Sequence, residues 1–445
     1  MTWKGSISLN VAAQLFNTVI SFIVAILVAR LLGVDGRGHY VLLITTAMFL
    51  VQVFSLGFET SIGYYASTAK MTVRKLVSTA VLALLILASM VALTIVIFSL
   101  FPSLKLLPYY TIPYYLILFL ITFFSLANSF FASLLNGLKH FNAVILLNLS
   151  IQVLTLLACL LFFLAAKDLV ETTSFLQAVV AIHALISIGY LYFYTKRIAF
   201  MPDGNVMNKA ELKAFFSYSF IAFLCSLLHF LNLRMDFWFI NYYYGSANLG
   251  VYSLAASLSQ LIWILPQSIA IILFPMSGYL KEKELKLETN KLCRMAFFTT
   301  LVPLPVAFAG ALLIPILFGK DFSEAIPLFY IFMVGMFPNI FVTILAAVFA
   351  GTGNLRYNLV ASLAGFGVAI FLYPVLIPTY GLVGGAIGSS ISYVATGFLG
   401  VYFYLKLYNT GWKEMLFVKP VELKDLILAL KKRKPSDKLS NDKHG

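Results

Sequence analysis

Three charged side chains lie deep inside long apolar stretches of the sequence: Glu59, Arg234 and Asp236. Each costs about 2.5–3.5 kcal/mol at the centre of a membrane-spanning helix, so each should face protein or water and not lipid. Arg234 and Asp236 are two residues apart, so on a helix they point to nearly opposite sides and cannot simply pair. His229 precedes Asp236 by seven residues and shares its face. These charges either form ion pairs between helices or line a water-filled cavity that contacts a charged substrate or a coupling ion.

Neutral polar residues recur at helical spacing in four of the apolar stretches. The stripes are Asn10, Gln14, Asn17 and Ser21; Gln52, Ser55 and Glu59; Asn148, Gln152 and Thr155; and Ser253, Ser257, Gln260 and Gln267. Polar stripes inside a bilayer must face other helices or water. Hydrogen bonds between helices, worth about 0.6 kcal/mol each, could account for any one stripe. Four stripes together predict a hydrated lumen.

The elements that carry these residues are long apolar helices. Hydrophobic residues make up 61% of the chain and charged residues 11%, whereas about a quarter of a soluble domain is charged. Twelve apolar segments are long enough to cross a bilayer, which needs roughly 20 residues. They are 7–32, 40–65, 76–101, 114–135, 144–166, 175–194, 215–243, 249–279, 292–318, 326–350, 359–377 and 382–404. The sequence therefore predicts an all-α polytopic membrane protein with twelve transmembrane helices.

The distribution of basic residues predicts the orientation. With the N-terminus in the cytoplasm, inside segments carry 25 of the 31 lysines and arginines and outside turns carry five. Cytoplasmic loops are enriched in these residues, so both termini are predicted to lie inside. This places Arg37 and Lys320 outside and Lys75, Lys209 and Lys283 inside. Positive inside loops and a basic tail account for the net charge of +14, so no nucleic-acid partner is expected.

A short pattern, G-x4-G-x-Y, recurs in equivalent turns of the two halves of the chain. Gly33, Gly38 and Tyr40 form the first copy, and Gly245, Gly250 and Tyr252 form the second, 212 residues later. The repeat predicts two six-helix bundles, 1–200 and 215–408, joined by a cytoplasmic linker at 201–214. Two similar halves are the usual architecture of a membrane transporter, with the substrate between them.

The remaining segment, 409–445, is a basic cytoplasmic tail. Its residues 421–432 have the pattern of a surface helix on anionic lipid, although a solvated tail is the alternative. In the twelfth segment, Gly384, Gly388, Ser392, Thr396 and Gly400 recur every four residues, which predicts close helix packing. Pro266, Pro275, Pro303 and Pro305 are expected to bend or break their helices.

Several kinds of chemistry have no motif in this sequence. A glycine-rich phosphate loop is missing, and the three cysteines, Cys159, Cys225 and Cys293, lack metal-ligand spacing. External loops are too short to fold into a catalytic domain, which argues against a polysaccharide polymerase. No catalytic residue, cofactor or metal is therefore expected.

Four groups of residues resemble the signatures of the polysaccharide transporter, or O-antigen flippase, family. These are 29–33 with Gly38, Tyr40, Leu56 and Gly57; Arg234 and Asp236 with Gly250, Tyr252, Phe274 and Pro275; 318–328; and 378–393. This family belongs to the multidrug/oligosaccharidyl-lipid/polysaccharide exporter superfamily. The resemblance implies two six-helix bundles around a V-shaped cavity that opens to either side in turn. It also implies transport of an undecaprenyl-diphosphate-linked oligosaccharide of O-antigen, capsule or exopolysaccharide across the bacterial inner membrane.

Within this reading, Arg234 is the first candidate contact for the diphosphate and Arg30 the second. Asn10, Gln14, Asn17, Gln52 and Gln260 would line the lumen, and Glu59, Asp236 and His229 are candidates for coupling to an ion. The lipid bilayer and the lipid-linked glycan are the expected partners, together with polysaccharide polymerase and chain-length machinery. A cation-coupled multidrug exporter of the same superfamily is the main alternative, although the first helix lacks the acidic residue usual in that branch.

Overall fold

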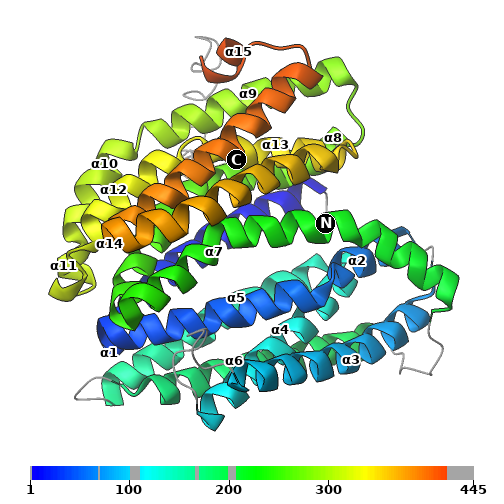
Figure 1. The fold of residues 1–445 in the computed structure, drawn as a ribbon. Helices are drawn as coiled ribbons and strands as arrows, with labels where there is room; N and C mark the ends of the chain where they lie inside the picture. The colour runs from blue at the N-terminus through cyan, green and yellow to red at the C-terminus, as the bar shows by residue number, and fades with distance from the viewer. Residues whose placement is uncertain (1–2, 69–70, 101–110, 166–169, 199–206, 418–445) are drawn as a thin grey trace, which may run out of the picture.

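All regular elements of the described residues are helices, which confirms the predicted all-α class. The computed structural model describes residues 3–68, 71–100, 111–165, 170–198 and 207–417 (Figure 1). The α-helices are α1 (Trp3–Ser55), α2 (Phe58–Thr68), α3 (Val73–Leu100), α4 (Ile112–Gly137), α5 (Phe141–Ala165), α6 (Thr172–Ile198), α7 (Lys209–Ser259), α8 (Ile264–Ser277), α9 (Glu282–Leu301), α10 (Leu304–Gly310), α11 (Ile314–Leu317), α12 (Ala325–Met336), α13 (Asn339–Gly351), α14 (Leu355–Leu407) and α15 (Trp412–Leu416). Short 3₁₀ segments include η2 (Gln260–Trp263).

Eight helical stretches of the described chain are long and apolar enough to cross a membrane, or nine if one bent pair counts as a span. Three of them, Gln14–Ser55, Ser219–Phe274 and Leu355–Leu407, contain 42, 56 and 53 residues, far more than the roughly 20 that one crossing needs. Each is interrupted by a glycine with positive φ: Gly33 at 65°, Gly245 at 80° and Gly381 at 63°. Glycine adopts this conformation without a steric penalty, so these positions let the chain turn back.

Contacts within the long stretches show this reversal directly. The Tyr252 hydroxyl reaches the carboxylate of Asp236, 16 residues earlier, whereas 16 residues of straight helix would span about 24 Å. The Arg37 guanidinium likewise approaches the carbonyl of Ala25 at 3.5 Å. The two arms on either side of each glycine therefore lie side by side.

Buried apolar side chains form two large clusters that follow the order of the chain. One is built from residues of the first half, between Ile20 and Phe215. The other is built from residues between Phe237 and Met415, joined by Ala29 and Leu42 of α1. In Figure 1, α3, α4 and α6 lie on one side of α1 and α7, and α9, α12 and α14 lie on the other. The two cores therefore meet along α1 and α7.

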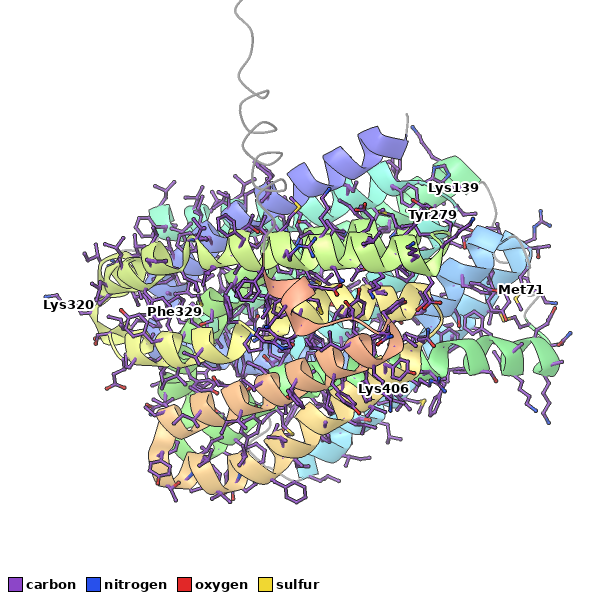
Figure 2. All side chains as sticks on the ribbon, turned by 90° about the horizontal axis from the view of Figure 1, so that it is seen from above. Met71, Lys139, Tyr279, Lys320, Phe329 and Lys406 are labelled. Atoms are coloured by element: carbon purple, nitrogen blue, oxygen red, sulfur yellow. The ribbon has the colours of Figure 1, made fainter. Side chains whose placement is uncertain are left out.

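The two ends of the bundle are named here for reference. We call the end with the turns at Gly33, Gly245 and Gly381 the glycine end, and the opposite end the lysine end. Figure 2 shows Lys320 at the glycine end and Met71, Lys139 and Tyr279 at the lysine end. Which end faces the cytoplasm stays a prediction.

At the glycine end, the two copies of the repeated pattern pack against each other. A Cβ atom added to Gly38 would overlap the backbone carbonyl of Ser246, and one added to Gly250 would overlap the carbonyl of Val34. The Ser246 hydroxyl also donates to the carboxylate of Asp35. The first glycine of each copy thus reverses the chain, and the second allows close approach to the other half. This reciprocal contact closes the glycine end.

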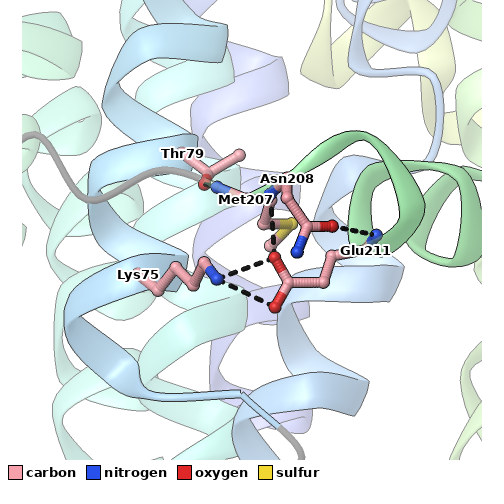
Figure 3. A network of polar contacts seen from close by, with 5 residues as sticks. All are labelled: Lys75, Thr79, Met207, Asn208 and Glu211. Atoms are coloured by element: carbon pink, nitrogen blue, oxygen red, sulfur yellow. Dashed lines mark hydrogen bonds and ion pairs between the residues drawn. The ribbon is translucent and has the colours of Figure 1, made fainter.

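At the lysine end, the start of α7 is fastened to the first half (Figure 3). The Lys75 ammonium lies 2.8 and 2.7 Å from the two carboxylate oxygens of Glu211. Asn208 and Glu211 form a capping box, so α7 begins at Lys209, inside the segment predicted as a linker. The backbone N–H of Met207 donates to the Thr79 hydroxyl at 3.0 Å. The hydrogen bond from Lys75 lowers the pKa of Glu211 below its usual value.

Two features of the helices depart from regular geometry. The segment predicted as one helix over 40–65 breaks at Leu56 and Gly57, where φ is 47° and 72°. A Cβ on Gly57 would lie 2.9 Å from the Ser219 carbonyl oxygen, so this glycine lets α7 approach. Breaks lie at two of the predicted prolines: 3₁₀ segment η2 precedes Pro266, and α9 ends just before Pro303. Helix α8 continues through Pro275 to Ser277, so no break occurs there. The predicted surface helix at 421–432 lies outside the described residues.

Candidate functional site

Arg234 is held on α7 by a neutral side chain. Its Nη2 donates to Oε1 of Gln260 at 2.9 Å, and its guanidinium lies 5.0 Å from the centre of the Phe237 ring. Its Nη1 is buried without a hydrogen-bond partner among the described residues. The amide fixes the orientation of the guanidinium but does not neutralise its charge, so Arg234 keeps a net positive charge and an unused donor.

Asp236 is fully buried in a group of hydroxyls. Its Oδ2 accepts hydrogen bonds from the Tyr252 hydroxyl at 2.7 Å and from Ser389 Oγ at 2.9 Å. Ser389 also lies 3.0 Å from the Tyr373 hydroxyl. Among the described residues Asp236 and Arg234 form no ion pair, as their spacing on the helix requires. The carboxylate is therefore stabilised by neutral donors and leaves the arginine available.

A polar cavity of about 470 Å³ lies beside Arg234, and we call it the polar cavity. Its polar lining comes from α7, η2, α8, α13 and α14: Ser226, His229, Gln260, Gln267, Asn339, Thr343, Asn358 and Ser362. Apolar side chains, among them Leu233, Trp263 and Phe349, form the rest of its wall. Gln260 belongs both to this lining and to the hydrogen bond with Arg234. Polar cavities at membrane depth lie where water or a substrate occupies the protein. Arg234 thus lies directly behind the wall of such a space.

Residues 260–267 border, on their opposite side, an apolar cavity of about 650 Å³. Leu261, Ile262 and Leu265 line it. The rest of its wall comes from Leu15 and Phe22 of α1, Thr299 and Thr300 of α9, and apolar residues of α10, α11 and α12. Residues 260–267 therefore separate a polar space from an apolar one. Such a pair of spaces suits a molecule with one polar and one apolar part.

The predicted lumen residues of the first half lie elsewhere. Asn17 Oδ1 is buried without a partner among the described residues, and Gln52 is half-buried. Glu59 accepts a long hydrogen bond of 3.4 Å from Ser55 Oγ, and its other oxygen is buried without a described partner. Gln14 is half-buried, and the side chain of Asn10 lies outside the described ones. The lining of the polar cavity comes from the second half, so these residues do not share it with Gln260.

Arg30, the second predicted contact for a diphosphate, is engaged at the glycine end. Its Nε donates to the carbonyl of Leu317 at 2.9 Å, and its Nη2 donates to the carbonyl of Ile316. These are the last two carbonyls of α11, which have no partner within the helix. In this conformation Arg30 therefore joins α1 to the second half and does not reach the polar cavity.

Some residues of the site could not be identified from their spacing. Ser389 and Tyr252, which hold Asp236, belong to helix arms far from it in sequence or beyond a turn. Asn339 follows Pro338 at the start of α13, and Asn358 lies in the first turn of α14. Both asparagines are polar residues near the start of an apolar helix, and this position was the one sequence signal that could have marked them.

The comparisons with known proteins agree with this architecture. A family described as "Polysaccharide biosynthesis protein" matches residues 3–281. A capsular polysaccharide biosynthesis protein, CapF of Staphylococcus aureus, is 27% identical over 212 residues, which cover 45% of this chain and 52% of that protein. The match thus spans about half the length of this relative.

Two solved structures are similar over nearly the whole chain. The lipid II flippase MurJ in an inward closed conformation has a TM-score of 0.71 at 16% identity and covers 97% of this chain and 93% of its own. An inward-facing multidrug resistance MATE family transporter has a TM-score of 0.65 at 16% identity and covers 90% and 98%. At these identities the likeness is one of fold. The chain is a multi-pass membrane protein with the fold of these transporters, and it belongs to the polysaccharide biosynthesis protein family.

Proposed function

We propose that this protein is a flippase for a polyprenyl-diphosphate-linked oligosaccharide, a repeat unit of O-antigen, capsule or exopolysaccharide. It would carry this lipid across the bacterial inner membrane by alternating access. The sugars and the diphosphate cross between the two halves while the polyprenyl tail stays in lipid, and no covalent step is needed. The family match and the capsular relative support the substrate class.

The observation that carries this proposal is the state of Arg234. Arg234 is half-buried, and the Nη1 end of its guanidinium is covered by protein. A charged group in such a place normally has an anionic partner, because an isolated buried charge is costly. Here its described partner is the amide of Gln260, and Nη1 has none. A diphosphate would supply the missing negative charge through charge-assisted hydrogen bonds, for which a guanidinium has the right fork geometry.

The proposed architecture has twelve transmembrane helices in two six-helix bundles, 1–200 and 215–408. The three long stretches with glycine turns each count as two crossings in this arrangement, and two separate apolar cores support the division. The closed glycine end and the fastened start of α7 belong to one conformation of the transport cycle. We place the lysine end and both termini in the cytoplasm.

The direct test replaces Arg234 and measures surface glycan per molecule of protein in the membrane. Losing a hydrogen bond to a charged group costs about 1.5–3 kcal/mol, so Arg234→Ala should reduce export per molecule about tenfold or more. Arg234→Lys should retain part of the activity, because the charge remains and the fork is lost. Arg356→Ala is the matched control, since Arg356 is exposed and contacts only Tyr357 in the described contacts. Normal export per molecule in Arg234→Ala would exclude the substrate contact.

A cation-coupled multidrug exporter is the second candidate function. The buried carboxylate of Asp236, whose Oδ1 has no described partner, and the likeness to a MATE family transporter favour it. In that case cells lacking the protein would accumulate ethidium, and Asp236→Asn would not restore its efflux. Unchanged ethidium efflux with accumulation of lipid-linked intermediate on the cytoplasmic face would favour the flippase.

A further inference from the structure

The polar cavity has a chemical character that neither Arg234 nor the family explains. Four carboxamides, those of Gln260, Gln267, Asn339 and Asn358, line it together with hydroxyls and several apolar side chains, and no carboxylate belongs to its lining. A cation would therefore find no counter-charge among the lining residues. Carboxamides and hydroxyls offer both donors and acceptors without charge, which suits a neutral ligand with many hydroxyl groups.

Two of these carboxamides have unused hydrogen-bonding atoms. Gln260 gives its Oε1 to Arg234, while its Nε2 is buried without a partner among the described residues. Asn339 is 2% exposed, and its Oδ1 is likewise buried without a described partner. Leaving such atoms unpaired costs about 1–3 kcal/mol each. Both atoms are covered by neighbouring protein atoms in this conformation. A ligand hydroxyl in the cavity would satisfy them once the two side chains turn toward it, because a hydroxyl can accept from an N–H and donate to a carbonyl oxygen.

The cavity lies next to Arg234, so the group that binds in it must be bonded to the group that binds Arg234. Gln260 contacts the guanidinium with one end of its carboxamide and lines the cavity with the same side chain. A molecule whose phosphate reaches Arg234 therefore places its neighbouring group at the wall of the cavity. In a lipid-linked glycan, the group bonded to the diphosphate is a sugar ring.

We propose that the polar cavity binds the uncharged sugar ring next to the diphosphate, with Gln260 and Asn339 as its principal hydrogen-bond partners. This inference rests on the proposed flippase function and assigns the sugar contact to the second half alone. A volume of about 470 Å³ lies within the roughly 300–1,000 Å³ of small-molecule sites. His229 and Gln267 complete the polar wall on α7 and α8.

The test measures binding to the full-length protein in nanodiscs with soluble short-chain probes. Farnesyl diphosphate reports the diphosphate contact, and farnesyl diphosphate carrying glucose, galactose or N-acetylglucosamine reports the sugar contact. We expect at least one sugar to tighten binding to the wild type. Asn339→Leu should remove about two- to tenfold of that gain, the range for one hydrogen bond, and should leave the affinity for farnesyl diphosphate unchanged.

The control variant is Ser390→Ala, which removes a buried hydroxyl of the second half outside the cavity lining. Melting temperatures show whether each variant is folded, and Gln267→Leu replaces Asn339→Leu if the latter is not. If no sugar tightens binding, or if Asn339→Leu and Gln267→Leu both keep the full gain, the cavity holds only water and the inference fails. If farnesyl diphosphate itself does not bind, or binds equally well to Arg234→Ala, the proposed function fails instead.

Discussion

The two copies of the glycine–tyrosine turn share their backbone but use their tyrosines differently. Gly33 has φ 65° and ψ −171°, and Gly245 has φ 80° and ψ −179°, so both reverse the chain in the same way. Tyr40 packs edge-on against Phe175 at 5.5 Å between ring centres. Tyr252 is fully buried and donates its hydroxyl to Asp236.

This difference shows that the repeat preserves the architecture and not the chemistry. Both turns contribute equally to closing the glycine end, because each second glycine meets the backbone of the other half. Both halves contain a carboxylate oxygen and a guanidinium nitrogen that are buried without a described partner, Glu59 and Arg37 in the first half and Asp236 and Arg234 in the second. The polar cavity, however, is lined by second-half residues alone. A transporter built from two similar halves can therefore bind its substrate asymmetrically.

The largest effect should come from the reciprocal glycine contact. Gly38→Ala and Gly250→Ala each place a methyl group on a backbone carbonyl of the other half. Overpacking of this kind costs about 1–3 kcal/mol or more, and the closed end must also open. We expect both variants to lower the melting temperature by a similar amount and to abolish export.

The control is Gly367→Ala, because a Cβ at Gly367 has no neighbour within 4 Å. This substitution should be neutral or slightly stabilising, since alanine favours a helix interior over glycine by about 1 kcal/mol. A strong effect of Gly38→Ala with none of Gly250→Ala would show that the contact is not reciprocal.

The sequence predicts this contact region better than it predicts the site. The turns at Gly33 and Gly245 could be predicted from apolar segment length and from the glycines themselves. Both signals are contained in one short segment of the sequence and do not depend on how helices pack. The partners of Asp236 come from 16 and 153 residues away, and no spacing rule reaches across separate helices. Ser389 lies within the small-residue segment predicted for packing, so its polar role was hidden. Arg30 was predicted from its charge alone, and its carbonyl partners in α11 depend on how the two halves dock.

The tyrosine comparison predicts a smaller, one-sided effect. Tyr252→Phe removes a hydrogen bond to a buried carboxylate, which should lower the free energy of unfolding by about 1.5–3 kcal/mol. Tyr40→Phe keeps the ring contact with Phe175 and should change it by less than about 0.5 kcal/mol. Denaturation of the purified proteins in matched detergent measures both values.

A double-mutant cycle identifies the partner of Tyr252. In an Asp236→Asn background, Tyr252→Phe should cost clearly less, because the charged acceptor is gone. An equal cost in both backgrounds would mean that Tyr252 stabilises the fold through packing only.

The smallest effect concerns the lysine end and depends on pH. The pKa of Glu211 is lowered in the folded protein by Lys75, so its contribution to stability is present above the unfolded pKa of glutamate. That contribution is lost as the pH falls through the lowered pKa. The wild type should therefore melt slightly above Glu211→Gln at pH 7, and the difference should disappear in strong acid. Glutamine can also accept the capping bond from Asn208, so a difference that persists there would show that the charge of Glu211 is not responsible.

The 3₁₀ segment η2 has a consequence for the angular phase of the helix that follows it. Pro266 cannot accommodate the carbonyl of Ile262 in a regular α-helix, and residues 260–263 are wound more tightly. Each residue turns by about 120° in a 3₁₀ helix and about 100° in an α-helix. Four 3₁₀ residues therefore rotate the following helix by about 80° more than four α-helical residues would. In a continuous α-helix, the side chains of Gln260 and Gln267 would point in directions that differ by about 20° around the helix axis. The tighter winding instead spreads these two amides over about 60° of the axis, so a single proline sets the angular width of the wall that faces the polar cavity.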